Sequence, residues 1–345
     1  MQINSVTELL AYRGDLAGLI RNRLDPKLFT TDHNERWKMV FDLEMHLAFL
    51  GEAVRCNTPR LFTEYADWTC HLLMNSGGLS DQFYGCLQAI NEQIEQSGQG
   101  EWRTLAQGYL NAAINQQPPL YSYSGSFLTH DNPHFNLAKG FLDDCIALKR
   151  RAAMEKIQSA VASGVPVIDV YLKIITPVLH ELGRLWYLNR ITIGHEHYCT
   201  AVTQMVIAQL SPLIFNDTPK KGHLIALCVA GELHEIGARM LADICEMNGW
   251  DTLFLGADVP KVSLIDMLIE SNAQVLAISV SLASNLGAAF EVIEAVRNSV
   301  DCAETKIMVG GAAFNIDSSL WQKAGADGWA QDGPSALILA DKWRV

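Results

Sequence analysis

Three residues at the end of an apolar run have the types and the spacing of a metal-binding turn. Glu232, His234 and Gly237 stand in the segment GELHEIGARM, directly after the run LIALCVA. A neutral imidazole is a suitable nitrogen ligand for a transition metal, and a nearby carboxylate can fix its tautomer and its basicity. Alone the pattern is weak, because a histidine after a strand is more often a solvated or capping residue and Glu232 is then an ordinary loop acid.

Two further polar or small pairs follow later apolar runs. Ser279 and Ser281 end the run AISVSL, and Gly310 and Gly311 end the run MVGG. Serine hydroxyls can form hydrogen bonds with a buried polar ligand, and glycines allow the backbone to approach it closely. We therefore expect these pairs to belong to the same site as His234.

The elements that must position these residues are short apolar runs alternating with helical stretches. After the polar hinge NDTPKKG there are five such runs: LIALCVA, TLFLGA, VLAISVS, KIMVGG and DGWA. This alternation predicts an α/β domain over 222–345, a flavodoxin-like (Rossmann-type) fold with a doubly wound parallel sheet. A ligand of such a sheet binds outside the carboxyl ends of the strands, where all three groups are expected.

The order and spacing of these groups resemble the cobalamin-binding domain of methionine synthases, corrinoid proteins and light-sensing cobalamin repressors. The family signature is Asp/Glu-x-His-x-x-Gly, then a Ser-x-Leu-like segment, then Gly-Gly, and the match covers about residues 220–345. The resemblance implies that His234 is the lower axial ligand of cobalt and that the nucleotide tail is buried in the sheet. It implies these cobalamin-binding residues: Glu232, His234, Gly237, Ser279, Ser281, Gly310 and Gly311. The alternative is a generic flavodoxin-like domain that has these residues by coincidence.

A second motif lies in the preceding helical stretch. Trp186 is followed after nine residues by Glu196 and His197, in LWYLNRITIGHEHYCT. This is similar to the W-x9-EH motif of light-sensing, adenosylcobalamin-binding repressors, in which the Trp covers the upper face of the cofactor. The alternative is a core Trp and a helix-end HEH. Helical periods predict a four-helix-bundle cap over 136–215.

The chain departs from these repressors in two respects. A His that directly follows the Trp in the family is Tyr187 here, so that His195, His197 or water is left as the upper ligand after illumination. The N-terminal region also lacks a basic recognition helix, and the family's winged helix-turn-helix domain is therefore not expected. Residues 1–117 instead predict a separate helical domain, with 118–135 as a connector.

This layout resembles the photocobilins, cobalamin photoreceptors with an extra helical domain that binds biliverdin. A bilin needs an apolar slot with cations and hydrogen-bond donors. Residues of suitable chemistry for such a slot are Arg60, Tyr65, Trp68, His71, Tyr121, Tyr123, His130 and His134. The alternatives are that the aromatic residues are core, that Cys70 is an interior thiol and not a thioether site, and that the domain docks a partner and binds no pigment.

Composition excludes some classes of function. The formal charge of −12 and the pI near 5.3 argue against a nucleic-acid surface. No run reaches the length of a membrane span and no signal peptide is evident, so we expect a cytoplasmic protein. The eight cysteines include no CxxC pair and are expected to be buried thiols, not zinc ligands.

The function expected from sequence is signalling and not catalysis. Light would cleave the cobalt–carbon bond of adenosylcobalamin, and the protein, a homo-oligomer, would change its oligomeric state or its contacts with an unidentified downstream protein. A first alternative is a corrinoid methyl-carrier protein of a methyltransferase system. A second is a cobalamin store or a sensor indifferent to light.

Overall fold

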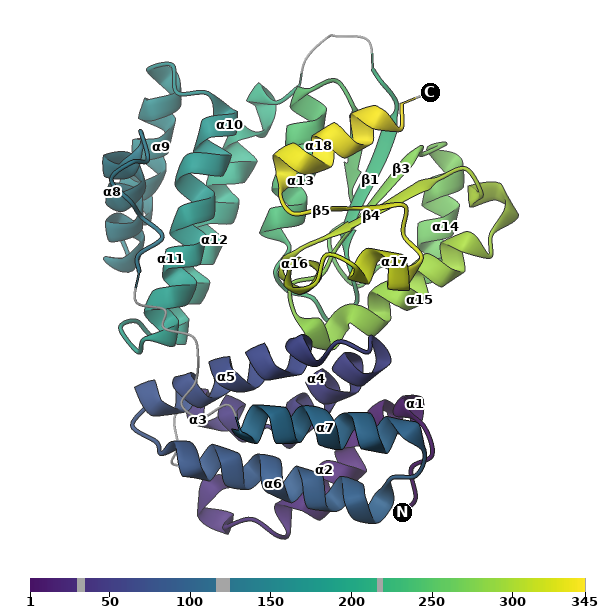
Figure 1. Ribbon diagram of the computed structural model, residues 1–345. Coiled ribbons are helices and arrows are strands. Elements are labelled where there is room, and N and C mark those ends of the chain that lie inside the picture. The colour runs from purple at the N-terminus through teal and green to yellow at the C-terminus, as the bar shows by residue number, and fades with distance from the viewer. Residues whose placement is uncertain (30–34, 116–124, 216–219, 345) are drawn as a thin grey trace. The chain divides into compact units, whose positions relative to one another are not determined.

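The computed structural model describes residues 1–29, 35–115, 125–215 and 220–344 (Figure 1). The chain divides into two compact units. The first comprises 1–121, 222–242 and 252–345, and the second comprises 122–221 and 243–251. None of the helices in the described ranges is long and apolar enough to cross a membrane.

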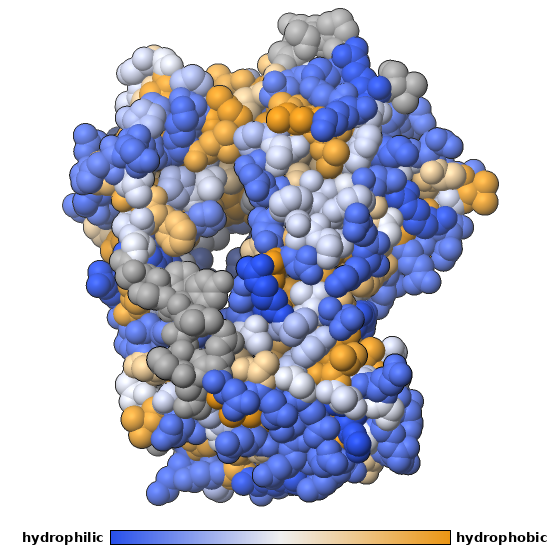
Figure 2. All heavy atoms as spheres, viewed as in Figure 1, coloured by the Kyte–Doolittle hydropathy of each residue, from blue (hydrophilic) through white to orange (hydrophobic). Residues whose placement is uncertain are grey.

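The first unit begins with a helical domain. Its helices are α1 (Val6–Ala11), α2 (Arg13–Arg21), η1 (Pro26–Phe29), α3 (Glu35–Val40), α4 (Leu43–Arg55), α5 (Pro59–Asn75), α6 (Ser80–Ser97) and α7 (Glu101–Asn115). Helix α5 begins at Pro59, whose fixed φ and missing N–H suit the first turn, and the chain leaves the helix through Gly77 at φ +85°. Apolar stripes of these helices form the core, and Figure 2 shows that the face over α6 and α7 is mainly hydrophilic.

The rest of the first unit is built on a five-stranded parallel sheet, which confirms the predicted α/β fold. The order is β2-β1-β3-β4-β5, with β1 at His223–Cys228, β2 at Asp251–Phe254, β3 at Val275–Ser279, β4 at Lys306–Gly310 and β5 at Gly328–Ala330. The connecting elements are α13 (Ile236–Met247), α14 (Lys261–Glu270), η4 (Ala283–Asn285), α15 (Leu286–Arg297), η5 (Val300–Cys302), α16 (Ala312–Ile316), α17 (Leu320–Ala324) and α18 (Gly333–Lys342).

The strand register brings the predicted residues to one edge. Cys228 at the end of β1 is level with Ser279 at the end of β3, and Ser279 is level with Gly310 at the end of β4. The central strands are almost entirely buried, as expected for apolar runs covered by helices on both faces. The turns that follow these three strand ends therefore form a common surface.

The second unit contains the expected helical cap. Its elements are α8 (Phe135–Ile146), α9 (Arg150–Ala162), α10 (Val167–Asp169), the π-helical turn η2 (Val170–Ile175), α11 (Thr176–Tyr187), α12 (Ile193–Leu210) and η3 (Ser211–Leu213). Thr192 caps α12 by accepting a hydrogen bond from the backbone N–H of His195. Buried side chains such as Phe141, Ile157, Val178 and Val206 form the core between the four long helical segments.

Candidate functional site

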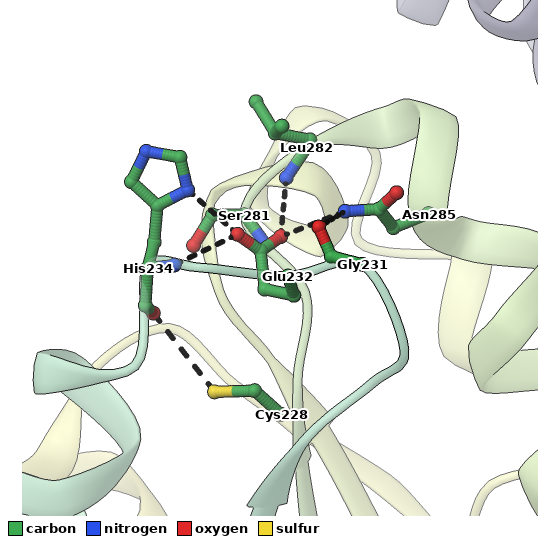
Figure 3. A network of polar contacts seen from close by, with 7 residues as sticks. All are labelled: Cys228, Gly231, Glu232, His234, Ser281, Leu282 and Asn285. Carbon is green, nitrogen blue, oxygen red and sulfur yellow. Dashed lines mark hydrogen bonds and ion pairs between the residues drawn. The ribbon is translucent and has the colours of Figure 1, made fainter. Parts of the chain in front are cut away.

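The loop between β1 and α13 carries the acidic residue and the histidine of the first motif. Gly231 starts this turn at φ +76°, a conformation that favours glycine, and its backbone N–H donates to Oδ1 of Asp258 at 2.8 Å. Glu232 then points into the loop cluster while the imidazole of His234 points away from the strands (Figure 3). Both residues therefore lie at the strand-end edge of the sheet. Glu232 is buried beneath the surface there, and His234 is exposed on it.

Glu232 and His234 form a tight pair. Oε1 of Glu232 lies 2.6 Å from Nδ1 of His234 and also accepts a 3.1 Å hydrogen bond from the backbone N–H of that residue. The Glu232 side chain is 0% exposed, whereas the His234 side chain is 62% exposed. A buried carboxylate thus holds an imidazole that faces outward.

The second carboxylate oxygen of Glu232 joins the turn after β3. It accepts hydrogen bonds from the backbone N–H groups of Ser281 at 2.8 Å and Leu282 at 2.9 Å, and from Nδ2 of Asn285 at 3.3 Å (Figure 3). Burial by itself would raise the pKa of Glu232, but the hydrogen bonds from His234 and from these backbone groups lower it to about 2. Glu232 is therefore ionised at neutral pH.

The charge of Glu232 decides the tautomer of His234. An ionised carboxylate only accepts hydrogen bonds, so Nδ1 of His234 must carry a proton, and in the neutral ring Nε2 then has the lone pair. Nε2 is then the atom that can bind a metal, and the carboxylate raises its basicity. No group of three or more His, Cys, Asp or Glu suited to a metal ion occurs in the described part of the chain. A single imidazole of this kind fits a metal whose other ligands come with a macrocycle, such as the cobalt of a corrinoid.

The glycines of the motif have two different structural roles. A Cβ on Gly311, which has φ +93°, would lie 2.3 Å from the carbonyl oxygen of Val280, and one on Gly310 would lie 2.7 Å from that of Ala330. These two glycines are thus required by the close approach of neighbouring backbone segments. Apart from its chain neighbours and its own helix backbone, no atom lies within 4 Å of the place where a Cβ on Gly237 would be, so the start of α13 has open space beside this residue.

The two predicted serines lie in or beside this network. Ser281 acts through its backbone N–H, and the Ser279 hydroxyl forms a hydrogen bond with Cys228. Burial raises the pKa of Cys228 to about 12, so it remains a thiol, and its Sγ lies 3.9 Å from the carbonyl oxygen of His234. Both serines therefore position the loop in this structure.

The second motif is divided between two helices of the second unit. Trp186 is half-buried near the end of α11, and Glu196 and His197 lie in the first turn of α12. Oε2 of Glu196 lies 2.7 Å from Nδ1 of His197, and its Oε1 accepts a 2.8 Å hydrogen bond from Oγ1 of Thr200. Tyr187, which replaces the family's His, is buried. The roles of Trp186, Glu196 and His197 toward a cofactor stay predictions.

The residues suggested for a bilin are divided between the two units and residues outside the described ranges. In α5, Arg60 pairs with Glu64, the hydroxyl of Tyr65 lies 2.7 Å from Nδ1 of the buried His46, and Nδ1 of His71 faces the carbonyl oxygen of Asp67. Trp68 is half-buried in the same helix. His130 and His134 belong to the second unit, and Tyr121 and Tyr123 lie outside the described residues. The buried ring of Tyr65 is stacked on Phe49, which identifies it as core.

Sequence analysis did not identify Asn285. Its side-chain amide lies within hydrogen-bond distance of Glu232 Oε2, at 3.3 Å, and of the Gly231 carbonyl oxygen, at 3.4 Å, so it joins the two turns of the site. The available signal was an amide residue in the helix start SLASNLG, directly after the Ser-x-Leu-like segment. Asn residues are common at such helix starts, which is why the signal is weak.

Comparison with known proteins supports a B12 site. Two family models, both described as a B12 binding domain, match residues 137–211 and 222–338. Dimethylamine corrinoid protein 2 of Methanosarcina mazei is 30% identical over 201 residues, 57% of this chain and 92% of that protein. Dimethylamine corrinoid protein 3 of Methanosarcina acetivorans is 26% identical over 200 residues, with the same coverage. The solved structure of the Methanosarcina barkeri monomethylamine corrinoid protein shares the fold, with a TM-score of 0.54 and 18% identity over 61% of this chain and 99% of that one.

These relatives overturn the expected light-sensing function. They are named as corrinoid proteins of methylamines, so the prediction of an adenosylcobalamin photoreceptor is wrong. Biliverdin binding, which depended on the photocobilin resemblance, has no support from them either. The error came from W-x9-EH, a motif of one Trp and one Glu-His pair near helix ends, which does not specify an upper ligand.

Proposed function

Because this chain belongs to the family of B12-binding corrinoid proteins, we propose that it carries methyl groups on a corrinoid for a methyltransferase system. The observation that supports this most directly is the pair formed by the buried, ionised Glu232 and the outward-facing His234. His234 is the proposed lower ligand of cobalt, through Nε2. The chain itself is the carrier, and its proposed partners are the methyltransferases that load and unload it.

When bound, a reduced corrinoid would supply a cobalt centre able to accept a methyl group from a donor and to release it to an acceptor. Glu232 holds the proton on Nδ1 of His234 and keeps the ring oriented outward. This hydrogen bond would orient His234 toward the metal and raise the basicity of Nε2 as a ligand.

Other residues are proposed to hold the cofactor. Gly237 leaves space at the start of α13 for part of the corrinoid. The turns with Ser279, Ser281, Gly310 and Gly311 give the strand-end surface on which the nucleotide tail would be held. Trp186, Glu196 and His197 are proposed contacts from the helical cap.

The methylated amines are the first donors to test, because several relatives are named for dimethylamine or trimethylamine. An extract of the source organism is depleted of this protein with an antibody and supplied with ¹⁴C-labelled mono-, di- or trimethylamine, or methanol, and a thiol acceptor. Depletion should abolish transfer of label from one donor, and addition of the purified, cobalamin-loaded protein should restore it in the dark. Unchanged transfer from all four donors after depletion would show that the protein is not a methyl carrier for them.

A further inference from the structure

The N-terminal helical domain contacts the same segment of the α/β domain that holds Glu232. Within the first unit, α4 packs against η4, which lies between the turn after β3 and the start of α15. This domain lies outside the matched ranges 137–211 and 222–338 of the two B12 models. The two B12 models therefore do not include the contact between this domain and the site.

The contact is centred on Glu52, in the last turns of α4. Glu52 is 4% exposed, and its carboxylate lies against the backbone of Gly287 in the first turn of α15. Its Oε2 lies 3.5 Å from Nε of Arg55. A carboxylate beside the first N–H groups of a helix is favourably placed, because the helix start has a positive electrostatic potential.

The fit around Gly287 is close. A Cβ on this glycine would lie 2.5 Å from Nη1 of Arg55 and 2.6 Å from Oε1 of Glu52. These two side chains thus rest directly on the backbone of α15. Movement of the end of α4 must change the position of this backbone or separate Glu52 from it.

A second group of contacts fixes the end of α4 to the α/β domain. Nζ of Lys323 in α17 donates to the carbonyl oxygen of Cys56 at 2.7 Å and to Oγ1 of Thr58 at 2.9 Å. Cys56 and Thr58 are both buried. The end of α4 is therefore held on two sides, by α15 and by α17, and Glu52 is not on a loosely attached helix.

The segment 281–287 connects Glu52 to the cobalt-ligand pair. At its start, the N–H groups of Ser281 and Leu282 donate to Oε2 of Glu232, and Asn285 does so from η4. At its end, the backbone of Gly287 lies against the side chains of Glu52 and Arg55. The segment is a short 3-10 turn that continues into α15, so one continuous stretch of backbone links Gly287 to the donors that orient Glu232.

We propose that Glu52 is a positioning residue for the lower ligand of cobalt, through which the N-terminal helical domain sets the fraction of bound corrinoid that is ligated by His234. This inference rests on the proposed role of His234. Loss of the contact between the Glu52 side chain and the Gly287 backbone loosens segment 281–287, and Glu232 then holds the imidazole less firmly. The helical domain is in this way a control element for axial ligation that does not touch the metal.

The test uses the full-length protein labelled with ¹⁵N and loaded with unlabelled cobalamin, reduced to the Co(II) state. In its electron paramagnetic resonance spectrum, a ¹⁵N ligand from the protein splits each cobalt line into a doublet, whereas the ¹⁴N of the cofactor's own benzimidazole gives a triplet. Wild type, Glu52→Ala, Glu52→Gln and His234→Ala are compared. Glu95→Ala is the matched control, because Glu95 is an exposed glutamate of α6 whose contacts with Arg103 and Gln107 stay within the helical domain.

The Glu52→Ala variant should lower the ratio of protein-ligated to other cobalt by roughly threefold or more, as expected for a change within a connected network. Glu52→Gln, which keeps the size of the side chain against Gly287, and Glu95→Ala should stay near wild type. Circular dichroism and thermal unfolding establish that each variant is folded. A folded Glu52→Ala protein with the wild-type ratio overturns the inference. Absence of the doublet in wild type would instead refute His234 ligation, so that the two failures are distinguishable.

Discussion

Glu232 and His234 are only two residues apart, yet the carboxylate is buried at 0% exposure while the imidazole that it holds at 2.6 Å is mostly exposed. The turn of the chain at Gly231 makes this arrangement possible, and the backbone donors of Ser281 and Leu282 keep the carboxylate charged. The proton of the pair therefore lies on Nδ1 of His234, and the outer ring nitrogen is a lone-pair donor.

Replacement of His234 should remove the protein ligand without unfolding the domain. Because the His234 side chain is largely exposed, His234→Ala should leave the thermal midpoint within a few degrees of wild type. The ¹⁵N doublet should disappear. His223→Ala, at the opposite end of β1, is the control and should retain it. Persistence of the doublet in His234→Ala would show that another residue binds cobalt.

Neutralisation of Glu232 should weaken cofactor binding more than it weakens the fold. Glu232→Gln keeps the volume of the side chain but loses the charge that fixes the Nδ1 proton. Since carboxylates behind a metal-bound histidine typically contribute about 10–100-fold to affinity, a loss within this range is expected in an equilibrium titration with cobalamin. An unchanged affinity would mean that the carboxylate serves only the loop.

Gly311→Ala should destabilise the protein in the absence of cofactor. The new Cβ would collide with backbone atoms of Val280, and φ of +93° is unfavourable for alanine. Rotation of a side chain can relieve neither the collision nor the backbone strain. The expected loss in the free energy of unfolding is about 3 kcal/mol or more. Denaturant titration of the apoprotein measures it, and a loss below about 1 kcal/mol would show that the β3 and β4 turns can separate easily.

Gly237→Ala should have the opposite effect to Gly311→Ala: it should leave stability unchanged or slightly higher and lower cobalamin affinity. No atom lies near the new methyl group in the apoprotein, and alanine is favoured over glycine in a helix, so stability should stay the same or rise slightly. Cobalamin affinity should fall if the corrinoid occupies the space beside α13. Equal affinities of Gly237→Ala and wild type would place the cofactor elsewhere.

The Glu52 carboxyl should make stability depend on pH near neutrality. Burial raises the pKa of Glu52 to about 7, opposed by Arg55, the Gly287 N–H and Arg13, and assisted by Glu291. The native state then binds more protons than the unfolded state between the ordinary carboxyl pKa and about 7, so stability falls as the pH rises through this window. Thermal unfolding between about pH 5 and about pH 8 should show a smaller decline for Glu52→Gln than for wild type. Parallel curves would indicate that Glu52 has an ordinary pKa.

The sequence by itself determined the sheet, its strand ends and the residues that follow them. Apolar runs of strand length between helical stretches allow few alternatives to a parallel sheet, and parallel strands end at a common edge. His234 after the first run, Ser279 after the third and Gly310 after the fourth therefore had to lie close together. Local periodicity was also sufficient for helices such as α5 and α7.

Only the tertiary structure decided how these residues act. Ser281 and Leu282 hold Glu232 through backbone N–H groups, which every residue except proline has, so no residue type in the sequence marks them. Gly310 and Gly311 proved to be required by contacts between backbone segments that are distant in sequence. In the sequence, Glu52 is not distinguished from the other glutamates of the helices. Its role depends on the fold, which places its side chain against Gly287. Such roles depend on which segments meet in space, and this is fixed by the packing of the whole domain and not by local pattern.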